Sequence, residues 1–202
     1  MTTTDHRPAG QPPAGQPHPG QAPAGQPPAA PAHASQATAV CEILAIDPGS
    51  LSELRECDDA GSPPVPVTDT GGGSPLRCCL RRSLPGERIA LVSYAPLRRW
   101  ARQSGAHPGP YDETGPVFIH PGPCPGPAGP GYPPEFTGTH RVFRAYSAAG
   151  QILDGRLVGP GETADPARAG AALAAMFADP AVAVVHVRAL EFGCFTFEAR
   201  RR

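Results

Sequence analysis

The sequence predicts an α+β domain, in which a mainly antiparallel sheet of about eight short strands is accompanied by two helices. Short apolar segments rich in valine, isoleucine, leucine and phenylalanine recur between turns of Gly, Pro and Asp, as in hairpin-linked strands. An Asp-Pro pair precedes each of two segments with helical character, and this pair is typical of a helix N-terminus. Most of the strands follow one another without a helix between them, so we expect antiparallel pairing.

The domain is expected to occupy residues 37–202, after a tail of different composition. Residues 1–36 contain a degenerate five-residue repeat of Pro, Ala, Gly and Gln, without large apolar residues. Proline restricts the backbone, and nothing in the repeat can drive collapse. We therefore expect a disordered tail with polyproline-II character.

The first half of the domain contains three apolar segments of strand length and one helix signal. The helix should begin where Asp47 acts as the cap and Pro48 takes the first helical position. A long stretch rich in Asp, Gly and Pro follows it and is expected to be a loop. In order, we expect a strand at 39–46, a helix from 48 to about 57, a loop at 58–75, and strands at 76–80 and 88–94.

The second half contains the other helix and the remaining strands. Asp165 and Pro166 repeat the cap signal, and apolar residues at helical spacing continue until Asp179 and Pro180 end the helix. In order, we expect a strand at 116–120, a rigid Pro/Gly loop at 121–134, a hairpin at 141–146 and 152–158, the helix, and a terminal hairpin at 182–188 and 194–198.

The composition excludes several classes of function. The chain has no lysine, which removes Schiff-base chemistry and the lysine of phosphate-binding loops. A net charge of −1 and a pI of about 6.6 give no electrostatic basis for binding nucleic acid or an anionic membrane. No segment reaches the ~18 consecutive apolar residues of a membrane span. We expect a cytoplasmic protein whose six cysteines are thiols, and we leave its oligomeric state open.

Motifs between residues 76 and 197 occur in an order shared with a known family. They are Arg77-Cys78-Cys79-Leu80, Pro85-Gly86-Glu87 with Tyr94, Tyr111 with Gly115-Pro116-Val117-Phe118, Arg144-Ala145-Tyr146, Phe177-Ala178-Asp179-Pro180-Ala181-Val182-Ala183, His186-Val187 and Gly193-Cys194-Phe195. In this combination the chain resembles the bacterial domain of unknown function family 1203. The resemblance implies a shared fold and supplies no reaction. The chain differs from the family by its tail and by the Pro/Gly insertion after His120, which contains Cys124.

The terminal hairpin holds the side chains best suited to chemistry. If its valines and phenylalanines share a buried face, its polar residues must share the other one. The buried face would carry Val185, Val187, Phe195 and Phe197, and the other face would carry His186, Arg188, Cys194, Thr196 and Glu198. A thiol, an imidazole, a guanidinium and a carboxylate would then lie on one surface.

Three arginines in predicted strands suggest that a sheet face binds an anion. Arg77, Arg144 and Arg188 each lie in a strand, where a charge needs a partner or an open face. Together with Tyr94 and Tyr146, they could hold a small anionic ligand by bidentate hydrogen bonds. The alternative is that each arginine pairs internally with Glu87, Asp154 or Glu198.

Two functions follow from these residues. Our first hypothesis is a non-catalytic module that binds a small ligand, such as a small anion, or a protein partner through the face carrying His186, Arg188 and Cys194, without a cofactor. The rival is a thiol-dependent enzyme with Cys194 as the nucleophile and His186 as its base, because a neighbouring imidazole or cation can lower the pKa of a thiol. A purely structural reading remains, since a free cysteine is often a small buried hydrophobe.

A Cys/His zinc site ranks last among the alternatives. Its candidate ligands are Cys78, Cys79, His120, Cys124, His186 and Cys194. Adjacent Cys78 and Cys79 in a strand would point to opposite faces, so at most one of them could join a given site. His120 and Cys124 stand four residues apart, but the intervening prolines exclude a helix that would place both on one face. No paired CxxC spacing is present either. The sequence therefore predicts no metal.

Overall fold

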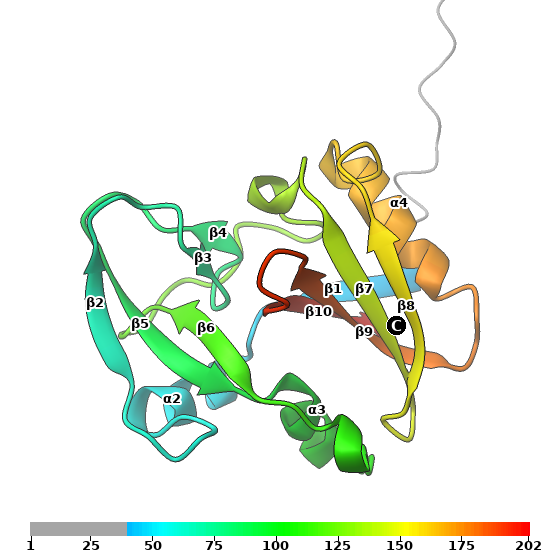
Figure 1. Ribbon diagram of the computed structural model, residues 1–202, viewed down its shortest axis with the longest axis horizontal. Coiled ribbons are helices and arrows are strands. Elements are labelled where there is room, and N and C mark those ends of the chain that lie inside the picture. The colour runs from blue at the N-terminus through cyan, green and yellow to red at the C-terminus, as the bar shows by residue number, and fades with distance from the viewer. Residues whose placement is uncertain (1–39) are drawn as a thin grey trace, which may run out of the picture. The chain divides into compact units, whose positions relative to one another are not determined.

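The computed structural model describes residues 40–202, and within them ten strands form two five-stranded sheets. The predicted tail at residues 1–36 lies outside the described residues. Figure 1 shows the two sheets, with helix α4 along one face of the sheet that contains the C-terminus. We call this sheet the C-terminal sheet and the other one the N-terminal sheet.

The C-terminal sheet has the strand order β1-β10-β9-β7-β8, and all of its neighbouring strands are antiparallel. The two predicted hairpins, β7–β8 and β9–β10, are confirmed. The strands are β1 (Cys41–Leu44), β7 (Arg141–Ser147), β8 (Ile152–Val158), β9 (Val182–Ala189) and β10 (Phe195–Arg201).

The N-terminal sheet has the strand order β2-β5-β6-β3-β4. Its neighbours are antiparallel except for β3 and β6, which run parallel with Leu76 opposite Phe118. This parallel pair brings the ends of two strands to the same edge. The strands are β2 (Val65–Asp69), β3 (Pro75–Leu76), β4 (Arg81–Arg82), β5 (Glu87–Tyr94) and β6 (Gly115–Ile119).

Both predicted helix caps are confirmed. The Asp47 carboxylate accepts a hydrogen bond from the Ser50 N–H at 2.9 Å. The Asp165 carboxylate accepts one from the Arg168 N–H, also at 2.9 Å. Such a cap typically stabilises a helix by about 1 kcal/mol. The helices are α2 (Pro48–Glu56), α3 (Pro96–Ser104) and α4 (Pro166–Met176), with 3₁₀ turns η1 (Gly109–Tyr111) and η2 (Pro134–Phe136).

The C-terminal sheet is covered on both faces. Helix α4 packs Leu173 into a core with Val185 and Val187, and α3 packs Trp100 against Val184. Residues 184–187 are therefore all fully buried, as in strands of a doubly covered sheet. Helix α2 packs Leu51 and Leu54 into the core of the N-terminal sheet. Full burial of a leucine such as Leu173 contributes about 1.5–3 kcal/mol.

Three elements, β2, β4 and α3, were absent from the sequence prediction, which expected about eight strands and two helices. Strand β2 lies inside the predicted loop 58–75; four of its five residues are exposed, so no apolar pattern marks it. Helix α3 contains three arginines and buries one face through Leu97, Trp100 and Ala101. Its single apolar stripe is too short to give a clear helical period.

Residues 76–80, predicted as a strand, form the end of β3 and a turn. The chain reverses at 77–80, and β4 then pairs with β3. Leu80 closes this turn with φ of 55°, a left-handed conformation that is uncommon for residues other than glycine. Because no Gly or Pro marks the turn, the run Leu-Arg-Cys-Cys-Leu resembled a strand.

A β-bulge in β10 changes the predicted faces of the terminal hairpin. Phe197 lies opposite Val187 and Phe195 lies opposite Arg188, so an extra residue is accommodated between the two phenylalanines. Phe195 therefore lies on the face of His186, while Phe197 packs in the core under α4. The prediction that the two phenylalanines share a face is wrong, because strict alternation cannot reveal a bulge.

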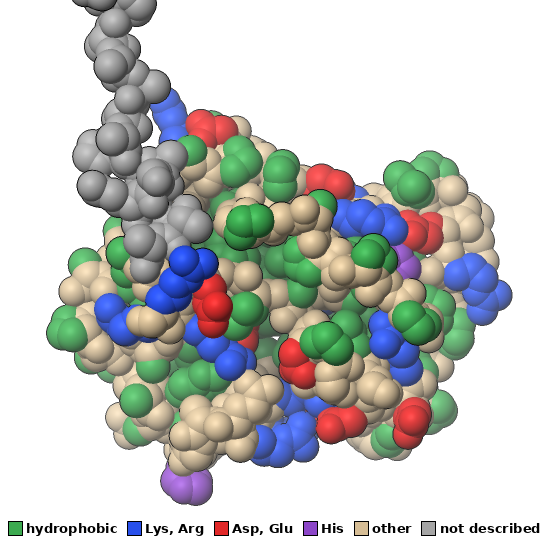
Figure 2. All heavy atoms as spheres, turned by 180° about the vertical axis from the view of Figure 1, so that it is seen from behind, with side chains coloured by type: hydrophobic (Ala, Val, Ile, Leu, Met, Phe, Trp, Pro, Cys, Tyr) green, Lys and Arg blue, Asp and Glu red, His purple; other side chains and the backbone are tan. Residues whose placement is uncertain are grey.

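Among residues 40–202, no helix has the length and apolar character needed to cross a membrane. The face in Figure 2 carries arginine and acidic side chains in neighbouring positions, which agrees with the net charge of −1.

Candidate metal centre

Cys78 and Cys79 lie in the turn between β3 and β4. A hydrogen bond from the Leu80 N–H to the Leu76 carbonyl closes the turn at 2.9 Å. Adjacent side chains in a strand point to opposite faces, but a turn is not bound by that alternation. Both cysteines are buried, and both reach the same histidine.

The parallel pairing of β3 and β6 places His120 beside this turn. Leu76 lies opposite Phe118, so Cys78 and His120, each two residues further on, extend past the same end of the sheet. The His120 N–H donates to the Sγ atom of Cys78 at 3.3 Å. The Pro/Gly loop after β6 then returns Cys124 to the same place.

The ligand atoms of these four residues, which we call the Cys/His cluster, have the spacing of a metal site. The Sγ atoms of Cys78 and Cys79 lie 3.9 Å apart. The Nδ1 atom of His120 lies 3.2 Å from the first and 3.8 Å from the second. With Cys124, all four ligand atoms lie within 4.8 Å of one another. In a tetrahedral zinc site with Zn–S bonds of about 2.3 Å, adjacent ligand atoms stand roughly 3.5–3.8 Å apart.

Glu87 orients the histidine of the Cys/His cluster. Its Oε1 atom lies 2.9 Å from Nε2 of His120, so this nitrogen carries the proton and Nδ1 turns its lone pair to the sulfurs. Arg81 and the Leu84 N–H also donate to the carboxylate, at 2.6 and 2.7 Å. Metal-binding histidines commonly donate their second nitrogen to a carboxylate in this way. The hydrogen bonds from Arg81, Leu84 and His120 hold the pKa of Glu87 well below its usual range.

The two adjacent thiols differ in acidity. The hydrogen bond from Cys78 lowers the pKa of the Cys79 thiol, and the Arg81 backbone N–H acts in the same direction. The same bond, together with burial, raises the pKa of Cys78. Cys79 is therefore the member of the pair that ionises first, and the thiolate is the form that binds metal.

The geometry overturns two of the three arguments against a shared site, those from the adjacent cysteines and from the His120–Cys124 spacing. Cys78 and Cys79 join one cluster because they lie in a turn and not in a strand. His120 and Cys124 join it because a Pro/Gly loop can reverse direction and does not need a helix to bring them together. The sequence signals that could have indicated this cluster are the Cys-Cys pair and the His-x₃-Cys spacing directly after a strand.

All four cluster residues lie in a part of the chain that matches a known family. The family model DUF1203, described as a protein of unknown function, matches residues 73–201. The chain belongs to this family. The resemblance drawn from the short motifs is thus confirmed, and DUF1203 itself carries no assigned activity. Comparisons with curated proteins and with solved structures found no match.

In this DUF1203 protein, Cys194 and His186 lie in different surroundings. Cys194 is half-buried, and its thiol lies 3.6 Å from the Phe192 carbonyl. His186 is fully buried between the rings of Tyr146 and Phe195, at centroid distances of 4.8 and 5.3 Å. Among residues 40–202, no hydrogen bond joins the two side chains. The bulge between Phe195 and Phe197 contributes to this separation, because it places Phe195, and not Cys194, on the face of His186.

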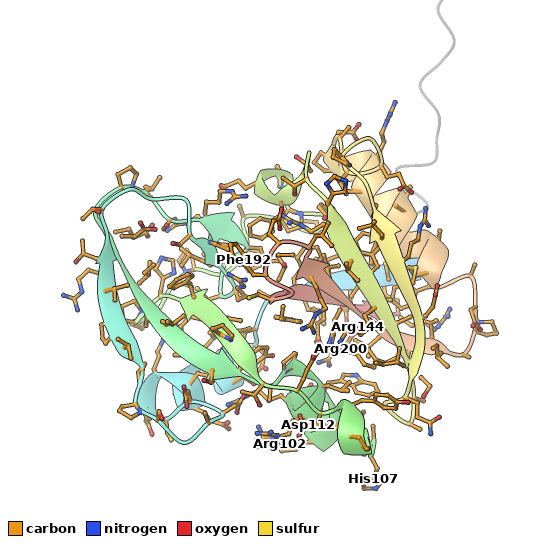
Figure 3. All side chains as sticks on the ribbon, in the orientation of Figure 1. Arg102, His107, Asp112, Arg144, Phe192 and Arg200 are labelled. Atoms are coloured by element: carbon orange, nitrogen blue, oxygen red, sulfur yellow. The ribbon has the colours of Figure 1, made fainter. Side chains whose placement is uncertain are left out.

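The predicted anion-binding residues are divided between two places in the DUF1203 domain. Arg144 and Arg188 both donate to the Glu113 carboxylate, so they pair internally, but with Glu113 and not with the expected partners Glu87, Asp154 or Glu198. Tyr146 lies beside them, fully buried, and Figure 3 shows Arg144 on the C-terminal sheet. Arg77 lies elsewhere, donating to backbone carbonyls.

Tyr94 and Arg77, the other two residues predicted to bind an anion, are both buried but make different contacts. The Tyr94 ring packs against Phe195 at 5.3 Å, with the Arg99 guanidinium 5.9 Å from its centroid. Arg77 is 3% exposed, and burial lowers its pKa to about 10, so it remains charged at neutral pH. Of the five residues predicted to bind an anion, the structure therefore joins Arg144 and Arg188 on Glu113 and leaves Arg77 on backbone carbonyls.

Replacing His186 by leucine is expected to flatten the pH dependence of stability below pH 6.5. Burial lowers the pKa of His186, although Glu198 lies 3.6 Å away. Below the ordinary histidine pKa of about 6.5, the unfolded chain therefore takes up a proton that the folded chain does not. The free energy of unfolding should fall with decreasing pH by up to about 1.4 kcal/mol per pH unit, until the lowered folded pKa is reached.

Urea denaturation between about pH 7 and pH 5 measures this slope. The matched control is His107→Gln, which changes an exposed histidine and should keep the wild-type slope. If His186→Leu and wild type showed the same slope, His186 would not be the source of the pH dependence.

Proposed function

We propose that this DUF1203 protein binds one zinc ion through Cys78, Cys79, His120 and Cys124. The observation that supports the proposal is the convergence of four ligand atoms, from a turn, a strand end and a loop, to within 4.8 Å. Three thiolates and one imidazole form a soft donor set, which suits zinc better than magnesium or calcium. Glu87 supplies the outer carboxylate that such a site needs.

The number of ligands favours a structural role for the metal. Catalytic zinc sites usually have three protein ligands and one open position, whereas structural sites are closed by four. Here four protein ligands are in reach, and two of them, Cys78 and Cys79, are buried. The metal would connect the β3–β4 turn, the end of β6 and the Pro/Gly loop. This supports a non-catalytic binding module in preference to an enzyme.

Metal titration of the full chain tests the proposal. Co²⁺ is the probe, because tetrahedral thiolate coordination gives intense visible and charge-transfer absorption, and Zn²⁺ should then displace it at one ion per chain. Cys79→Ser and Cys124→Ser are expected to lower the zinc affinity by more than about a hundredfold, since changes outside the ligands alone cost about 10- to 100-fold. Cys57→Ser is the control, because Cys57 is an exposed cysteine outside the Cys/His cluster.

Two results would contradict zinc binding at these residues. One is a Co²⁺ spectrum without thiolate charge transfer. The other is an equal zinc affinity for Cys79→Ser, Cys57→Ser and wild type.

A further inference from the structure

A cavity of about 910 Å³ lies where the two sheets face each other, apart from the Cys/His cluster. We call it the inter-sheet cavity. Its walls come from both sheets, and they include Arg77, Leu91 and Phe118 on one side and Arg141, Ala189 and Thr196 on the other. None of the four cluster residues lines it.

Three arginines line this cavity without an acidic partner. Within residues 40–202, no carboxylate lies within ion-pair distance of the guanidinium of Arg77, Arg82 or Arg141. Each guanidinium donates to backbone carbonyls instead: Arg77 to Phe195 at 2.8 Å, for example, and Arg82 to Gly73 at 2.8 Å. The Glu135 carboxylate is close to Arg82 but binds its backbone N–H and not its guanidinium. Neutral carbonyls offset the lost hydration of a guanidinium only in part.

Two of these arginines are almost completely buried. Arg77 is 3% exposed and Arg141 is 5% exposed. The Nε atom of Arg141 is buried and has no hydrogen-bond partner in the described part of the chain. Within the fold, the polar side-chain group that interacts with this guanidinium is the Tyr132 hydroxyl, which is itself buried without a hydrogen-bond partner in the described residues. Buried polar groups are nearly always paired, so a donor that is left unpaired beside a cavity is available to an acceptor from outside the fold.

The other walls of the inter-sheet cavity are aromatic. The ring of Phe136 lies close to two cations, with the guanidinium carbons of Arg82 and Arg141 at 6.0 and 5.9 Å from its centroid. Phe118 lines the opposite wall. Phe192, labelled in Figure 3 on the loop between β9 and β10, is 85% exposed. An exposed phenylalanine beside a cavity offers apolar surface to a bound molecule.

We propose that the inter-sheet cavity binds a small organic anion, whose carboxylate or phosphate meets the arginines and whose apolar body packs on the phenylalanines. Guanidinium groups bind both kinds of oxyanion through paired N–H donors. The volume is in the range of small-molecule sites. The one carboxylate that lines the cavity, Glu191, is exposed, so it leaves the buried arginines available.

Calorimetric titration of the full chain with three probes of similar shape tests whether the inter-sheet cavity binds an organic anion. Benzoate and phenyl phosphate carry the two anionic groups, and benzamide has the same body without charge. Benzoate or phenyl phosphate should bind, and the tighter of the two identifies which oxyanion the site prefers. Benzamide should bind at least about tenfold more weakly, since a hydrogen bond to a charged group is worth roughly ten- to hundredfold in affinity.

Substitutions of the arginines that line the inter-sheet cavity test whether the anion binds there. Arg141→Gln and Arg82→Gln should each weaken binding of the preferred anion by about ten- to hundredfold. Arg82 is only half-buried, so its variant stays informative if Arg141→Gln fails to fold, which circular dichroism would show. Arg168→Gln is the control, because its side chain is 69% exposed on α4 and away from the cavity.

Three outcomes would overturn the proposal. They are no binding of either anion, equal binding of the preferred anion and benzamide, and equal weakening by Arg82→Gln and Arg168→Gln.

Discussion

Zinc at a free concentration one thousandfold above its dissociation constant is expected to raise the free energy of unfolding by about 4 kcal/mol. The physical reason is linkage: the four ligands converge only in the folded chain, so the metal binds the folded state in preference to the unfolded one. Unfolding then has to break the coordination of three chain segments at once.

Urea denaturation in zinc-buffered and chelator-containing solutions, with reductant present, measures this difference. Cys79→Ser should lose most of the zinc-dependent part while keeping the stability of the metal-free chain. Cys57→Ser should behave as wild type. An equal free energy of unfolding with and without zinc, for wild type, would argue against metal-linked folding.

Removal of the Asp59 carboxylate, in Asp59→Ala, is expected to lower the free energy of unfolding by about 3–5 kcal/mol. Asp59 forms an ion pair with Arg99 of α3 at 2.9 Å, and the two side chains are only 7% and 6% exposed. The same carboxylate accepts a hydrogen bond from the Ala95 N–H at 2.7 Å, directly before α3. Glu53 also binds Arg99 but is 64% exposed, so it compensates the buried charge only weakly.

Thermal or urea unfolding of Asp59→Ala beside Asp154→Ala measures this loss. Asp154 is exposed on β8 and makes no ion pair within residues 40–202, so its loss should change stability by no more than about 0.5 kcal/mol. Similar stability of the two variants would show that the Asp59–Arg99 pair does not hold α3 in place.

The parts of the fold that were predicted correctly are those with a local signal. Asp47 and Asp165 mark helix starts because capping depends only on residues within one turn. The hairpin of β7 and β8 is visible because its turn residues and apolar runs are adjacent in the sequence. Strand β2 was missed because its pairing with β5, and not its own apolar content, makes it a strand.

The Cys/His cluster was missed for a related reason. Its members come together through the parallel pairing of β3 with β6, a contact between residues about 40 positions apart that leaves no periodic mark in the sequence. The left-handed conformation of Leu80, in the turn that holds Cys78 and Cys79, could not be predicted from the sequence either, because such a conformation is usually marked by a glycine and none is present. Residue types therefore indicated the candidates, and only the tertiary structure selected among them.

The bulge in β10 also has a consequence for how the domain unfolds. It directs Phe195 into the core of the N-terminal sheet and Phe197 into the core under α4, so two neighbouring positions of one strand serve both cores. Neither core can open without pulling on the strand that completes the other. We therefore expect the two sheets to lose their structure in one cooperative transition, as a single folding unit and not as two foldons.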